Sequence, residues 1–153
     1  MVKNVFKKLG KKQKNNKGFS LVELIVVIAI MAVLVGVLAP QLIKYVEKSR
    51  EATDIQTCDN IATALKTYYA DEEVSATATT VTVTLTKAEL GTGADTAVKD
   101  AGLTKAKIKG TKWTDDKITI VYDKKDGTIE YTGDSPYYHS DKDQFKKGPK
   151  SGK

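Results

Sequence analysis

The sequence predicts an α+β protein in which one long N-terminal helix packs on a small antiparallel β-sheet. Three observations predict this fold. An apolar run covers residues 19–39 and is interrupted only by Ser20 and Glu23. Apolar residues then recur at helical spacing over residues 42–69. Short segments rich in β-branched and aromatic residues follow, with turn residues between them.

The apolar segment 19–40 is long enough to cross a membrane as a helix. A helix rises about 1.5 Å per residue, and about 20 apolar residues span a hydrocarbon core roughly 30 Å thick. Lysine-rich residues 1–18 precede the segment, and lysines that flank a span stay on the cytoplasmic side. We therefore expect residue 1 inside the cell and residues 41–153 outside. The alternative is a buried core helix, which a domain of this size would rarely contain.

Most of the positive charge of the chain lies in the leader, residues 1–18. The net charge is +6, and this segment holds seven lysines and no acidic residue. Without these seven lysines the chain has 18 basic and 19 acidic residues. The basic composition is therefore no evidence for nucleic-acid binding, which we do not expect.

Glu23 does not suit a plain membrane anchor. A carboxylate at the centre of a helix in lipid costs on the order of 2.5–3.5 kcal/mol, and a position near the end costs less. We expect no partner for this acid in its own helix. The sequence therefore suggests a cation from another chain, such as a free α-amino group.

The hexapeptide Gly18-Phe19-Ser20-Leu21-Val22-Glu23 lies between the basic leader and the apolar helix. It resembles the class III signal peptide of type IV pilins and pseudopilins. The resemblance implies that a prepilin peptidase cuts between Gly18 and Phe19 and methylates the new amine of Phe19. It also implies that Glu23 engages the Phe19 amine of a neighbouring subunit during filament assembly, and that the chain has the type IV pilin fold.

This resemblance implies a structural protein and not an enzyme. The expected partners are identical subunits, prepilin peptidase, the pilus assembly machinery and, before assembly, membrane lipids. The mature chain would leave the cell membrane for an extracellular surface filament, of the kind that serves adhesion and twitching motility. One alternative is a pseudopilin of a type II secretion or competence DNA-uptake machine. Another class of alternative is a membrane-anchored surface adhesin that never assembles.

Pro40 follows the apolar run directly. Proline removes a backbone hydrogen bond to the carbonyl of Gly36, and Gly36 is itself a weak helix former. We predict a helix kink at Gly36 and Pro40; the alternative is that the membrane helix ends there. Residues 37–39 also resemble an ordinary signal-peptide cleavage site, but the apolar run exceeds the usual length and Pro40 constrains the bond.

The segment 41–134 is expected to form the globular domain. Its first part, to about residue 73, predicts an amphipathic helix whose charged residues, among them Glu47, Glu51 and Asp54, largely face solvent. Glu47 is positioned to pair with Arg50. The expected inner face contains Leu42, Tyr45, Val46, Ala52, Ile55, Cys58, Ala62, Leu65 and Tyr69.

Cys58 is the only cysteine, so an intramolecular disulfide is impossible. Many pilins of Gram-negative bacteria have such a disulfide, and its absence suggests a Gram-positive type of pilin. Cys58 lies on the apolar face of the predicted helix. We therefore expect it to be a core residue and not a nucleophile.

The rest of the domain predicts strands and short helices. Strands are expected at 81–85, 118–122 and 128–131, and one more within 107–114. Short helices are expected from a capping box at 86–89 and over 95–101, where Gly102 ends the helix.

No cofactor or metal is expected. In the turn 123–127, Lys125 occupies a position where a calcium loop needs an oxygen ligand. His139 has no matching nucleophile or metal-ligand cluster, so it supports no catalytic site. The charged segment 135–153 is expected to be a flexible C-terminal tail, whose lysines could alternatively contact acidic polymers.

Overall fold

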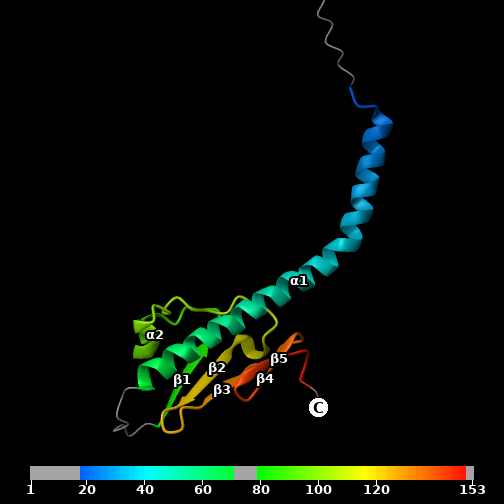
Figure 1. Cartoon of the computed structure of the whole chain (residues 1–153). Coiled ribbons are helices and arrows are strands. Elements are labelled where there is room, and N and C mark those ends of the chain that lie inside the picture. Colours follow the sequence, from blue (N-terminus) through cyan, green and yellow to red (C-terminus); the bar gives the residue numbers. More distant parts are fainter. Residues whose placement is uncertain (1–17, 71–78, 151–153) are drawn as a thin grey trace, which may run out of the picture. The chain divides into compact units, whose positions relative to one another are not determined.

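The computed structural model describes residues 18–70 and 79–150. The chain divides into two units, residues 1–40 and 41–153. The elements, in chain order, are α1 (Leu21–Ala70), β1 (Thr80–Leu85), η1 (Gly91–Gly93), α2 (Thr96–Asp100), η2 (Thr114–Asp116), β2 (Ile118–Asp123), β3 (Ile129–Thr132), β4 (Tyr138–Asp141) and β5 (Gln144–Lys147) (Figure 1).

Helix α1 continues through Pro40, which lies inside it. The structure therefore does not end the helix at this proline, as the alternative interpretation required. The predicted kink at Gly36 and Pro40 stays a prediction. Residues 71–73, the expected end of the amphipathic segment, lie outside the described residues.

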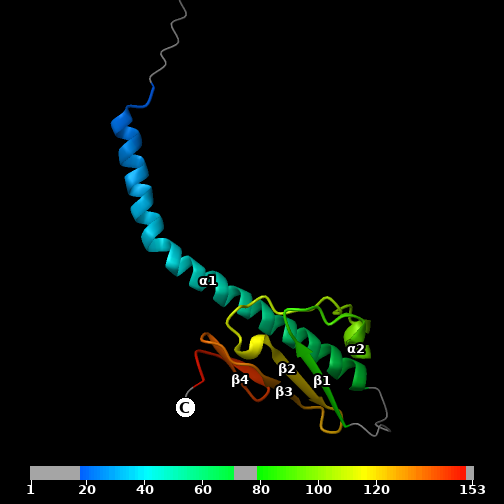
Figure 2. The ribbon, with the colours of Figure 1, turned by 180° about the vertical axis from the view of Figure 1, so that it is seen from behind.

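Strands β1, β2 and β3 form the small antiparallel sheet that the sequence predicted, and they lie in that order, which the sequence did not predict. Val83 pairs with Ile120, and Tyr122 pairs with Ile129. One face of the sheet is buried under the second half of α1, which runs across it (Figure 2). The helix contributes Cys58, Ile61, Ala62, Leu65 and Tyr69 to this core. The predicted α+β fold and the core position of Cys58 are confirmed.

The prediction of a flexible tail over 135–153 is wrong for the part that the structure describes. Strands β4 and β5 form an antiparallel hairpin there. Phe145 of β5 lies 5.2 Å from the ring of Tyr131 and 5.7 Å from that of Trp113, measured between ring centroids. The Tyr131 N–H also donates to the Lys142 carbonyl at 2.7 Å. These contacts hold the hairpin against the domain.

Two smaller predictions between β1 and β2 are also wrong. Residues 107–114 form no regular strand, and residues 86–89 form no helix. The Thr86 hydroxyl instead closes a local turn by accepting from Ala88 N–H at 3.2 Å. The other short helix is confirmed as α2. Asp95 caps its N-terminus, and Gly102 adopts a φ of +71° just after its end.

Candidate functional site

The N-terminus of α1 is closed by a capping box built from Ser20 and Glu23. The Ser20 hydroxyl accepts from the Val22 N–H at 3.3 Å. In return, Glu23 Oε2 accepts from the Ser20 N–H at 2.8 Å. Glu23 therefore has a partner in its own helix, contrary to our expectation. The S-x-x-E spacing was visible in the sequence and could have predicted this contact.

Gly18 and Phe19 lie just before the capped end and outside the helix. Both residues are exposed, and the Phe19 side chain is 90% exposed. Ser20 ends the helix on this side, so the peptide bond between Gly18 and Phe19 stays non-helical. The arrangement thus places an accessible peptide bond two residues ahead of a capped apolar helix.

The first half of α1 exposes apolar side chains around its whole circumference. Its large apolar residues from Leu21 to Leu38 are 48–74% exposed. By length and composition it can cross a membrane, and none of its most apolar stretch is buried. Such a uniformly apolar helix needs an apolar environment from outside its own chain. The structure therefore supports membrane anchoring through this segment.

The second half of α1 has the opposite property, because it buries three acidic side chains. Glu47, Glu51 and Asp54 are at most 6% exposed. Our prediction that they face solvent is therefore wrong. The predicted inner residues Leu42, Tyr45, Val46 and Ala52 are instead exposed. From Cys58 onward the predicted inner face is correct.

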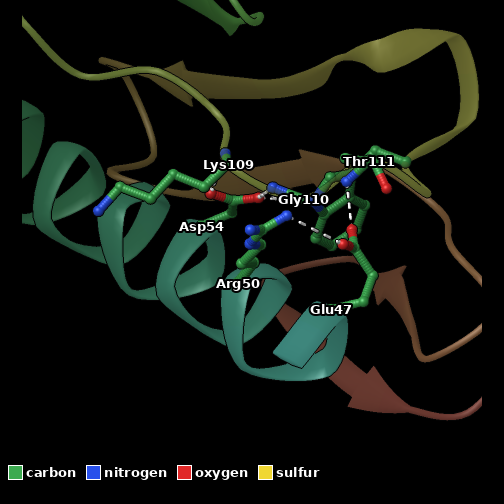
Figure 3. A network of polar contacts seen from close by, with 7 residues as sticks. Glu47, Arg50, Asp54, Lys109, Gly110 and Thr111 are labelled. Carbon is green, nitrogen blue, oxygen red and sulfur yellow. Dashed lines mark hydrogen bonds and ion pairs between the residues drawn. The ribbon is translucent and has the colours of Figure 1, made fainter. Parts of the chain in front are cut away.

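Asp54 is buried because its carboxylate accepts three hydrogen bonds from one loop (Figure 3). The backbone N–H groups of Lys109 and Gly110 each donate to it at 2.7 Å. The indole N–H of Trp113 donates at 2.9 Å. These N–H groups are engaged by a carboxylate and not by another strand, which explains why residues 107–114 form no ladder.

Glu47 and Glu51 extend the same contact along the helix. Glu47 accepts from the Thr111 N–H and lies 3.7 Å from the Arg50 guanidinium, the pairing that the sequence predicted. Glu51 accepts from the Ser135 hydroxyl. Burial, together with the nearby charges of Glu47 and Asp54, raises the pKa of Glu51, although the Ser135 hydrogen bond opposes this shift. The three acids bind the loop and the start of the C-terminal hairpin to α1.

The remaining polar residues that the sequence singled out have local structural contacts. Asp123 accepts from the Lys125 N–H at 2.8 Å, which closes the turn between β2 and β3. The His139 Nδ1 atom lies 2.8 Å from the Gly148 carbonyl oxygen. Within the described ranges, no group of three or more His, Cys, Asp or Glu residues is arranged to hold a metal ion.

Comparisons with known proteins agree with the N-terminal geometry. Residues 13–39 match the family model of the prokaryotic N-terminal methylation motif. The chain is also similar to prepilin peptidase-dependent protein A of Clostridium perfringens, with 40% identity over 70 residues. This match covers 44% of the chain and 49% of the relative, so the chain spans about half the length of that protein. No solved structure matches. The methylation motif, the similarity to this relative and the long helix on a small antiparallel sheet together support a type IV pilin-like protein.

Proposed function

We propose that the protein is a structural subunit of a type IV pilus and polymerises through its apolar helix after its leader has been removed. The observation that carries this proposal is the continuous exposed apolar surface of α1 from Leu21 to Leu38. In the membrane this surface contacts lipid, and in a filament it contacts the helices of identical subunits. The filament then lies outside the cell with the globular units on its surface.

The proposed processing step is cleavage between Gly18 and Phe19 by prepilin peptidase, followed by methylation of the Phe19 amine. The methylation motif covers both residues. Their non-helical, exposed backbone suits entry into a peptidase site. The name of the Clostridium relative indicates that its maturation depends on the same enzyme.

The proposed role of Glu23 is to receive the Phe19 amine of a neighbouring subunit. A carboxylate has two oxygens and about four acceptor positions. Glu23 can therefore keep its hydrogen bond from Ser20 and also accept from a cation on another chain. In an apolar filament core, loss of one partner would leave the other charge uncompensated. The assembly machinery would bring the two chains together.

The test compares Glu23→Ala and Glu23→Gln with wild type, measuring the ratio of subunit in sheared filaments to subunit in membranes. Glutamine retains an oxygen that can accept from Ser20 N–H but carries no charge. We expect both variants to be processed and membrane-inserted, and both to be strongly depleted from filaments. Normal assembly of Glu23→Gln would show that the helix cap, and not the charge, is what assembly requires.

Intact mass of the filament protein tests the processing step separately. We expect a chain that begins at Phe19 and carries one added methyl group. A chain that retains residues 1–18, or one that begins at Pro40, contradicts the proposal. Electron microscopy of the sheared material separates long surface filaments from the shorter filament of a pseudopilin. If the protein were an anchored adhesin, no filament would be seen, and Glu23 would have no role in assembly.

A further inference from the structure

A hollow of about 350 Å³ lies at the start of the globular unit. Its walls are formed by Gln41, Lys44, Tyr45, Lys48 and Tyr137. The first four residues come from α1, and Tyr137 comes from the segment just before β4. Tyr137 is fixed there because its N–H donates to Ser135 Oγ at 3.1 Å and its carbonyl accepts from the Gly148 N–H at 2.7 Å.

The hollow has a positive charge that the protein itself does not neutralise. Lys44 and Lys48 are four residues apart, so they lie on one face of the helix. Both are exposed, and neither joins any ion pair among the described residues. The acid between them, Glu47, is buried against the loop and paired with Arg50. An anion that enters the hollow therefore meets two available ammonium groups.

The position of the hollow along the chain matches the headgroup layer of a bilayer. The apolar segment ends at Pro40, so Lys44 lies about 6 Å and Lys48 about 12 Å further along the helix. A headgroup layer is about 5–8 Å thick on each side of the hydrocarbon core. The flexible stem of Lys48 allows its ammonium group to reach back toward that layer. Tyr45 and Tyr137 add the aromatic rings typical of membrane interfaces.

We propose that this hollow binds the headgroup of an anionic phospholipid while the subunit is in the membrane. The lysines bind the phosphate, and the two tyrosines flank the glycerol region. The proposal requires only that residues 19–40 span the membrane, and it does not depend on filament assembly. Phosphatidylglycerol has the required chemistry, because it carries a net negative charge close to the hydrocarbon boundary.

The test uses the full chain in nanodiscs that contain equal parts of phosphatidylglycerol and phosphatidylcholine. The protein is released into detergent, and native mass spectrometry identifies the lipid that stays bound. We expect wild type to retain phosphatidylglycerol preferentially. Lys44→Ala with Lys48→Ala should lower this retention at least about tenfold, since each basic residue near an anionic surface contributes appreciably. Lys44→Arg with Lys48→Arg should preserve it.

The matched control is Lys66→Ala with Lys99→Ala, which removes two exposed lysines of the same unit away from the hollow. It should retain the lipid as wild type does. Tyr45→Ser changes the wall of the hollow without changing its charge and should also weaken retention. Equal retention of the two lipids, or full retention by the Lys44/Lys48 alanine variant or by Tyr45→Ser, would overturn the proposal. Displacement of the lipid by an equal concentration of soluble glycerol 3-phosphate would show a phosphate site and not a lipid site.

Discussion

The first half of helix α1 exposes apolar side chains, whereas its second half buries three carboxylates. The large apolar residues from Leu21 to Leu38 are all at least 48% exposed, while Glu51 is fully buried. Each of the three buried carboxylates accepts at least one hydrogen bond from its own chain, which offsets part of the cost of burial, although Glu51 Oε1 has no hydrogen-bond partner among the described residues. Among the described residues, the large apolar side chains of the first half are not covered by other parts of the chain. The comparison shows that the second half is packed within its own domain, whereas the first half presents an apolar surface for contacts outside it.

The largest effect on the stability of the globular unit should come from Asp54→Ala, measured in a fragment of residues 41–153. This unit contains the whole buried core, so we expect the fragment to fold as a soluble monomer. The substitution removes the acceptor of three N–H groups in and beside the loop, and should lower the free energy of unfolding by about 3 kcal/mol or more. Urea denaturation measures this loss. Gln56→Ala, at an exposed position of the same helix, should change the stability by less than about 0.5 kcal/mol.

The next largest effect should come from Gly110→Ala. An added Cβ would lie 2.7 Å from Glu51 Cγ, 2.8 Å from the Trp113 indole nitrogen and 2.9 Å from Asp54 Oδ2. The loop must then move away from the carboxylates, at a cost of about 2–3 kcal/mol. Gly93→Ala is the matched control, because a Cβ there meets no atom within 4 Å. Equal unfolding midpoints for the two variants would contradict the close packing of the loop on α1.

A moderate effect is expected from Phe145→Ala in the C-terminal hairpin. The ring is half-buried against Trp113 and Tyr131, so its loss should cost about 2 kcal/mol. Urea denaturation measures this loss of unfolding free energy, and Phe145→Leu should lose less of it than Phe145→Ala. If the alanine variant were as stable as wild type, the hairpin would contribute nothing to the domain, as a flexible tail would.

The smallest effect concerns pH. Folding raises the pKa of Glu51 above its ordinary value of 4.5, so the folded state binds this proton more tightly than the unfolded state. The resulting stabilisation is complete below the unfolded-state pKa and is lost as the pH rises through the folded-state pKa. Glu51→Gln removes this contribution. Urea midpoints from about pH 4 to about pH 8 should therefore fall less steeply in the variant than in wild type. If the urea midpoints of the two proteins changed with pH in the same way, Glu51 would not contribute to the pH dependence of stability.

The sequence predicted those parts of the fold that depend on side-chain periodicity. Cys58, Leu65 and Tyr69 lie in the core, and the three strands β1 to β3 are where alternation placed them. In contrast, burial of Asp54 depends on backbone N–H groups 55 and 56 residues away. The positions of backbone N–H donors cannot be inferred from side-chain hydropathy. The hydropathy pattern therefore predicts a solvent-exposed position for Glu47, Glu51 and Asp54.

The C-terminal hairpin was missed for a different physical reason. Its turn places Lys142 at a φ of +54°, a conformation usually adopted by glycine or asparagine, so the sequence lacks the ordinary turn signal. Its strands are four residues long, and Tyr138 is the only buried residue in them, so they lack a clear alternation of apolar and polar positions. At the candidate site, the roles of Gly18, Phe19 and Glu23 follow from their motif and stay predictions. The Ser20–Glu23 hydrogen bond is a local helix-capping contact, which the S-x-x-E spacing specifies independently of any partner in another chain.

The three buried carboxylates also set an order of events during synthesis. Their donors come 55 to 84 residues later in the chain. At about 5–20 residues per second, roughly 4–17 s separate the synthesis of Glu51 from that of its partner Ser135, the last of these donors. The apolar half can enter the membrane during this interval, while the acids of the outer half are still ionised and hydrated. The globular unit therefore completes its folding only after its C-terminal part has been synthesised, and until then the ionised carboxylates make the second half of the helix far less suited to lipid than the first half.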